Sequence, residues 1–106
     1  MDLAIRQLLA RLKKGLEELY GERLKGVYLF GSYGRGQADE HSDIDVLIVL
    51  DEVRHYSEEI ARTSELIGQL SLESNRSISR VFVSAERWRE EQTMFFLNVR
   101  QEAQPV

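Results

Sequence analysis

Apolar side chains recur every three or four residues from Leu3 to Tyr20, and charged side chains occupy most of the positions between them. This periodicity is typical of an amphipathic helix, so the pattern predicts a helix over residues 3–20. Gly21 follows directly and is suited to end that helix, because glycine adopts the left-handed backbone of many helix ends without strain. A similar spacing predicts a second helix over residues 56–70.

Three short runs rich in β-branched and aromatic side chains predict strands over residues 27–30, 43–50 and 78–83. The second run is almost continuously apolar after Asp45. We therefore expect it to be an interior strand that is covered on both faces of a sheet.

A last helical stretch is predicted from Ala85, with Ser84 as its N-cap, and the final residues 104–106 are expected to form a tail. The order of the elements predicts an α/β fold in one domain over residues 1–106, with a small mixed sheet and helices packed mainly on one face. Three aromatic residues of the last stretch are candidates for the core or for a partner surface: Trp88, Phe95 and Phe96.

The composition indicates where the protein is located and which classes of partner are unlikely. The chain has 106 residues, no cysteine and a formal net charge of −4. The absence of cysteine excludes disulfides and thiol catalysis, and a cytoplasmic location is expected. The longest purely apolar run, Val46–Leu50, is too short to span a membrane, so no membrane association is expected. The acidic net charge makes nucleic acid an unlikely partner.

Gly31 and Ser32 follow the first predicted strand and begin a turn that is rich in glycine. Such a turn lets a phosphate approach the backbone amides closely, because glycine lacks a Cβ atom and tolerates positive φ. The glycine spacing differs from that of dinucleotide-binding folds. It also differs from a P-loop, since Gln37-Ala38 occupies the place of the required lysine and hydroxyl residue.

Asp43 and Asp45 are separated by one residue at the start of the second predicted strand, so both side chains are expected on the same face, opposite Ile44. Two close carboxylates repel each other unless one takes a proton or a divalent cation lies between them. Oxygen ligands favour Mg²⁺ or Mn²⁺ over zinc. The pair is a candidate metal site, and a polar strand end without chemistry is the alternative.

Gly31-Ser32, ten further residues and then Asp43-Ile44-Asp45, all between two apolar strands, resemble the signature of the polymerase-β-like nucleotidyltransferases. The short chain is similar to their minimal (MNT) subgroup. The resemblance implies a polymerase-β-like nucleotidyltransferase fold in which Gly31 and Ser32 contact the phosphates of ATP. It implies that Asp43 and Asp45 bind Mg²⁺ (or Mn²⁺), and that Arg35 or Tyr33 lies near the phosphates.

The same resemblance implies a reaction and a partner. The expected reaction is transfer of a nucleoside monophosphate, AMP from ATP, onto a protein hydroxyl. Small members of this family are often encoded with a HEPN-type ribonuclease toxin, so the expected partner is such a toxin and the expected role is that of an antitoxin. The sequence leaves open whether the chain also forms a homo-oligomer.

The chain departs from the family pattern at one position. Active members usually add a third carboxylate from a later strand, but residues 78–83 contain no Asp or Glu, and the corresponding position falls near Ser79 or Arg80. Arg80 is a candidate to hold phosphate directly instead. Two functions stay open: a transferase that works with one metal or with groups from a partner, and a non-catalytic antitoxin that binds nucleotide or only occludes its partner.

Overall fold

The computed structural model describes residues 3–39 and 41–106. The helices along these residues are α1 (Leu3–Tyr20), the 3-10 turn η1 (Gly21–Arg23), α2 (Gly31–Gly34), α3 (Tyr56–Ser74), α4 (Ala85–Glu90) and α5 (Met94–Glu102). The strands are β1 (Leu24–Phe30), β2 (Ile44–Leu50), β3 (Ile78–Ser84) and β4 (Gln104–Pro105). The two long helices and the three predicted strands therefore lie where the sequence pattern indicates them.

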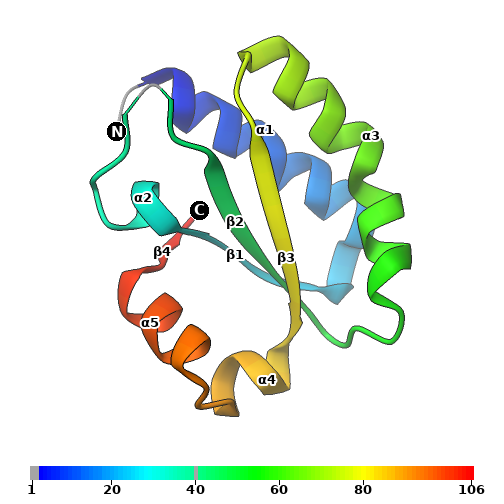
Figure 1. Cartoon of the computed structure of the whole chain (residues 1–106). Coiled ribbons are helices and arrows are strands. Elements are labelled where there is room, and N and C mark those ends of the chain that lie inside the picture. Colours follow the sequence, from blue (N-terminus) through cyan, green and yellow to red (C-terminus); the bar gives the residue numbers. More distant parts are fainter. Residues whose placement is uncertain (1–2, 40) are drawn as a thin grey trace.

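The strands form one mixed sheet in the order β3-β2-β1-β4 (Figure 1). β1 pairs with β2 in antiparallel orientation, whereas β2 and β3 are parallel and are connected by α3. β2 is the interior strand that the sequence predicts, and every residue of it except the half-buried Asp45 is buried. The mixed sheet and the covered central strand confirm the predicted fold class.

The two long helices α1 and α3 cover one face of the sheet, and the short helices α4 and α5 cover part of the other (Figure 1). Alternate residues of β2 supply the two cores because successive side chains of a strand point to opposite faces. Ile44 packs with the α1 and α3 core, whereas Leu47 packs with Phe96 and Val99 of α5. Along the described residues, no helix combines the length and the hydropathy that a bilayer span needs.

The carboxyl-terminal segment differs from the prediction in two respects. The expected tail contains β4, which pairs with β1 at the edge of the sheet. Pro105 is compatible with this position because an edge strand does not need every N–H group. The predicted last helix is divided into α4 and α5. Ser84 caps α4 as predicted by accepting a hydrogen bond from the Arg87 N–H, and Thr93 caps α5 in the same way.

A buried carboxylate joins the end of α1 to the start of α3. Glu59 is 4% exposed and accepts hydrogen bonds from Tyr20 Oη at 2.8 Å, Arg23 Nη2 at 3.1 Å and Arg62 Nε at 3.0 Å. Burial alone would raise the pKa of Glu59, but the three donors outweigh it and hold the pKa below its ordinary value. Burial raises the pKa of Tyr20, and the hydrogen bond to Glu59 raises it further.

Candidate active site

The chain turns sharply at Gly31, between the end of β1 and the single turn of α2. The φ of Gly31 is +66°, a left-handed conformation that favours glycine. A Cβ atom at this position would lie 2.3 Å from Oδ2 of Asp45, far inside van der Waals contact. The missing side chain therefore allows the turn to lie directly against the carboxylate of Asp45. Ser32 follows in α2 and is half-buried.

The two aspartates lie at the amino-terminal end of β2. Asp45 is opposite Phe30 in the antiparallel pairing of β1 with β2, and Asp43 is exposed just before the strand. Burial raises the pKa of Asp45, the charge of Asp43 raises it further, and the Arg35 guanidinium lowers it in part. The structure thus brings the two carboxylates close enough to repel each other, an arrangement that a divalent cation would relieve.

Arg35 lies at the end of α2, between the carboxylate pair and α5. Its Nη1 is 3.3 Å from Oε2 of Glu102, and its Nε donates to Oε1 of Gln37 at 3.3 Å. The segment after α5 also contacts α2, because Nε2 of Gln104 donates to the carbonyl of Gly34 at 2.8 Å. The end of α5 and the start of β4 therefore help to fix the turn that carries Ser32 and Arg35.

The loop that leads from α2 to Asp43 is held by Arg76, a residue that the sequence did not single out. Nη2 of Arg76 donates to the carbonyls of Ser42 at 3.1 Å and Asp39 at 3.3 Å. Its guanidinium also lies 5.4 Å from the centre of the Tyr33 ring. The sequence gives no local signal for this role, because Arg76 lies 34 residues from Ser42. Tyr33 itself packs against the α1 and α3 core.

Ser79 is the residue beside Asp45 on the neighbouring strand. The parallel register of β2 and β3 pairs Asp45 with Ser79, and residues paired in this way share a face of the sheet. Among the residues that the structure describes, no group of three or more acidic, histidine or cysteine side chains is arranged to hold a metal. Ser79 therefore occupies the place expected for a third carboxylate.

Arg80 lies on the opposite face of the sheet, where α3 binds its side chain. Its Nε donates to Oγ1 of Thr63 at 2.7 Å, and its Nη2 donates to the carbonyl of Ile60 at 2.8 Å. The hypothesis that Arg80 holds phosphate is therefore wrong. Arg80 pairs with Val46, whose side chain belongs to the α1 and α3 core, so its own side chain also points to that face.

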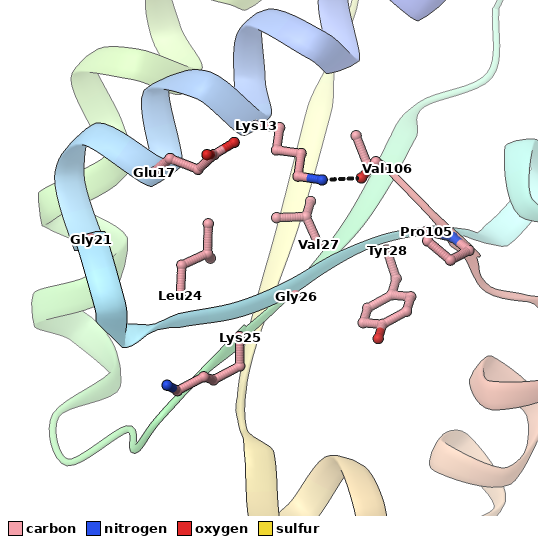
Figure 2. Close-up of a pocket in the computed structure, with 10 residues that line it drawn as sticks. All are labelled: Lys13, Glu17, Gly21, Leu24, Lys25, Gly26, Val27, Tyr28, Pro105 and Val106. Atoms are coloured by element: carbon pink, nitrogen blue, oxygen red, sulfur yellow. Dashed lines mark hydrogen bonds between the residues drawn. The ribbon is translucent and has the colours of Figure 1, made fainter.

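Two grooves of about 460 and 570 Å³ run along α1 and the edge of the sheet. Both are lined by Lys13, Glu17, Pro105 and Val106, and Figure 2 shows the smaller one, in which Lys13 Nζ donates to the carbonyl of Val106 at 2.8 Å. Among the described residues, Glu17 contributes the one acidic side chain that lines either groove, so neither groove offers paired acidic side chains for a metal-bound triphosphate. The chemistry places the candidate active site at Asp43 and Asp45 instead.

The profile of the nucleotidyltransferase domain matches residues 9–96, which include the turn at Gly31, both aspartates and all of β3. The chain belongs to this nucleotidyltransferase family. A relative from Methanocaldococcus jannaschii, named "Putative protein adenylyltransferase MJ1379", is 34% identical over an alignment of 85 residues, and the match covers 74% of this chain and 83% of that protein. A bifunctional uridylyltransferase/uridylyl-removing enzyme of Pseudomonas putida is 39% identical over an alignment of 66 residues, and the match covers 60% of this chain and 7% of that enzyme.

Solved structures of nucleotidyltransferases share the fold. A structure described as a minimal nucleotidyltransferase is 27% identical, with a TM-score of 0.62, and the match covers 100% of this chain and 97% of that one. A toxin-antitoxin crystal structure with AMP-PNP has a TM-score of 0.65 at 22% identity, covering 91% of this chain and 69% of that one. An MNT antitoxin in complex with a tri-AMPylated HEPN toxin of Shewanella oneidensis has a TM-score of 0.54 at 18% identity, covering 92% and 70%. This nucleotidyltransferase chain is therefore similar to the minimal members of the family.

Proposed function

We propose that this chain transfers AMP from ATP to a hydroxyl group of another protein and that it depends on Mg²⁺ (or Mn²⁺). The observation that carries the proposal is the Gly31-Ser32 turn lying directly against the carboxylate of Asp45, with Asp43 close by. Membership of the nucleotidyltransferase family and the relative named as a protein adenylyltransferase support the reaction class. The AMP-PNP in a structure of similar fold supports ATP as the donor.

Asp43 and Asp45 would hold the cation. Their oxygen atoms suit Mg²⁺ or Mn²⁺. Burial raises the pKa of Asp45 and the charge of Asp43 raises it further, and a bound cation would stabilise the charged carboxylate against both effects. When bound, the cation supplies positive charge that orients the triphosphate and stabilises the departing pyrophosphate. The donor set of the described residues fits one cation better than two, because Ser79 rather than an acid lies beside Asp45.

Ser32 and the backbone of the turn would hold the phosphates. The Ser32 hydroxyl can donate a hydrogen bond, and the absence of a side chain at Gly31 leaves the neighbouring backbone open to a close approach. Arg35 adds a positive charge near Asp45. In the reaction, the acceptor oxygen attacks the α-phosphorus and loses its proton, while the bond from that phosphorus to the bridging oxygen breaks and releases pyrophosphate.

The partner proposed for this activity is a HEPN-type toxin, which this chain would neutralise as an antitoxin. The support comes from the structures of similar fold, which include toxin-antitoxin complexes and an AMPylated HEPN toxin bound to an MNT antitoxin. A cytoplasmic setting follows from that role. The hydroxyl of the partner would be the acceptor in the transfer reaction.

A second candidate function is supported by Ser79. A serine in place of the third carboxylate removes one anionic ligand from the site, which favours an antitoxin that binds nucleotide or only covers its partner. Both candidate functions involve the same partner protein. They differ in whether AMP becomes covalently bonded to that partner.

Label transfer distinguishes the two candidates. The chain is incubated with its co-purified partner and ATP labelled at the α-phosphate, with Mg²⁺ or Mn²⁺. We expect label on the partner, and we expect Asp43→Asn with Asp45→Asn to abolish it. Glu86→Gln with Glu90→Gln removes the same charge from exposed positions of α4 and should leave transfer unchanged. If no label appears and the aspartate variant still neutralises the partner, the chain is an occluding antitoxin.

The substitution Ser79→Asp tests the missing carboxylate directly. It places an acid opposite Asp45 in the β2–β3 register, so we expect a second Mn²⁺ to bind per chain and label transfer to rise by roughly ten-fold or more. Ser79→Asn has nearly the same shape without the charge and should change neither quantity. An unchanged Mn²⁺ stoichiometry in Ser79→Asp would contradict the assignment of this position.

A further inference from the structure

Phe95, in the first turn of α5, exposes an aromatic ring beside the candidate active site. Its side chain is 45% exposed, although its neighbours Phe30 and Phe96 are half-buried and buried. The Phe30 ring lies 6.1 Å from it at an interplanar angle of 87°, and the Phe96 ring lies 5.4 Å from it at 90°. Both contacts are edge-to-face, so neither ring is stacked parallel to Phe95.

The ring connects to the site through Phe30. Phe30 directly precedes Gly31 and lies opposite Asp45 in the β1–β2 register, so the side chains of Phe30 and Asp45 share one face of the sheet. Phe95 packs on Phe30 from α5, and α5 also contacts α2. Figure 1 shows the two helices on the same side of the molecule, with β4 between them in the view. Asp45, Phe30 and Phe95 therefore follow one another across this face, leading away from the phosphate turn.

Two arginines close to α5 lie over other aromatic rings. Arg87 lies over Phe96, and Arg100 lies over Trp88 and Phe96, at 5.3 to 5.8 Å from the ring centres. Within the described part of the chain, the ring–cation contacts do not include Phe95. The ring is thus packed along its edges by aromatic neighbours, and nothing in these contacts stacks on its exposed surface.

We propose that Phe95 is the stacking surface for the base of the nucleoside triphosphate whose phosphates bind at Ser32 and the two aspartates. This inference rests on the proposed function and adds the residue that recognises the base. A flat ring attracts every base because every base has a π-face. The contact therefore recognises the presence of a base rather than its identity, and purines, with their larger surface, bind more tightly than pyrimidines.

The test compares a ligand that has a base with one that lacks it. Titration calorimetry of the full chain with Mg²⁺·ATP and with Mg²⁺·tripolyphosphate separates base binding from phosphate binding. We expect Phe95→Leu, which keeps an apolar contact with Phe30, to weaken ATP binding by about five- to ten-fold and to leave tripolyphosphate binding within about two-fold of wild type. Phe95→Trp should bind ATP at least as tightly as wild type. Leu97→Ala, at a position of the same helix that is 42% exposed, is the matched control and should change neither affinity.

Each outcome separates this inference from the proposed function. If wild-type protein binds neither ligand, the proposed function fails and the stacking inference fails with it. If wild-type protein binds both ligands equally, or Phe95→Leu weakens both by the same factor, the phosphate site stands and the stacking inference is overturned. If Phe95→Leu leaves ATP binding unchanged but releases a co-purified partner, the ring belongs to a protein interface and the inference is likewise overturned.

Discussion

Gly31 is the residue on which the geometry of the site depends most directly. Its backbone is left-handed, and the space beside it is filled by Oδ2 of Asp45. We predict that Gly31→Ala lowers the free energy of unfolding by about 1–2 kcal/mol, the usual cost of a left-handed residue with a Cβ atom. Because Asp45 must also move, we expect Mg²⁺·ATP binding to weaken by at least ten-fold. Urea unfolding and titration calorimetry measure the two effects.

Gly21 supplies the matched control for this prediction. Its φ is +56°, but apart from the adjoining residues of the chain, no described atom lies within 4 Å of the position that a Cβ would take. Gly21→Ala therefore carries the same backbone strain without displacing a carboxylate. We expect it to lower stability and to leave Mg²⁺·ATP binding unchanged. Equal loss of binding in both variants would show that global strain, rather than the contact with Asp45, explains the effect.

At the scale of elements, the loop between α2 and β2 depends on a residue from the α3–β3 turn. Arg76 donates to the carbonyls of Asp39 and Ser42, so it fixes the backbone just before Asp43. We predict that Arg76→Ala weakens Mg²⁺·ATP binding by about five-fold, because the loss of hydrogen bonds from a charged donor lets Asp43 move relative to Asp45. Arg76→Lys keeps the charge and should recover part of the affinity.

The comparison variant for Arg76 is Arg89→Ala, which removes an exposed arginine from α4. It changes the net charge equally and should leave nucleotide binding as in wild type. Thermal unfolding of each variant shows whether the fold is retained. If Arg76→Ala binds Mg²⁺·ATP normally while remaining folded, the loop keeps its geometry without the arginine, and the positioning role is wrong.

Local periodicity explains why most elements were predictable. α1, α3 and β2 each bury one or two regular faces, and their patterns are visible in any short window of the sequence. β4 was missed because two residues have no periodicity, and only pairing with the distant β1 makes them a strand. The division between α4 and α5 was missed as well, although Thr93 is a residue type that often begins a helix.

The residues of the candidate site fall into the same two groups: those with a local signal in the sequence and those whose role depends on tertiary packing. The turn at Gly31 and the pair Asp43 and Asp45 were predicted from residue type, spacing and the family resemblance that they carry together, because each motif is contiguous in the sequence. The contributions of Arg76 and Phe95 arise from tertiary packing of segments far from the motif. The sequence left open whether Ser79 or Arg80 lies beside the aspartate pair. Only the strand register shows that Ser79 shares a face of the sheet with Asp45.

At the scale of the whole molecule, the candidate site and the buried Glu59 lie at opposite ends of the sheet. The site lies at the end of β1 and the start of β2, whereas Glu59 binds Arg23, which precedes β1 and also pairs with Asp51 after β2. Stability that depends on Glu59 is therefore separable from nucleotide binding. A variant at Glu59 should lower stability and leave the affinity for Mg²⁺·ATP of the folded protein unchanged.

The pH dependence of stability follows from the lowered pKa of Glu59. Because its folded-state pKa lies below the ordinary value of 4.5, the stabilisation by the Glu59 network is fully present above about pH 4.5 and is lost as the pH falls through the folded-state pKa.

We predict that Glu59→Gln lowers the free energy of unfolding by about 2 kcal/mol at pH 7, since it weakens three charge-assisted hydrogen bonds, two of them to half-exposed arginines. The difference from wild type should shrink as the pH falls below 4.5, because protonation then removes the same charge from the native residue. Urea unfolding at pH 7 and pH 3.5 measures it, with Glu73→Gln, which breaks an exposed pair with Arg11, as a control that should change stability little. A difference between wild type and Glu59→Gln that stayed constant down to pH 3.5 would show that packing, rather than the charge of Glu59, stabilises this end of the molecule.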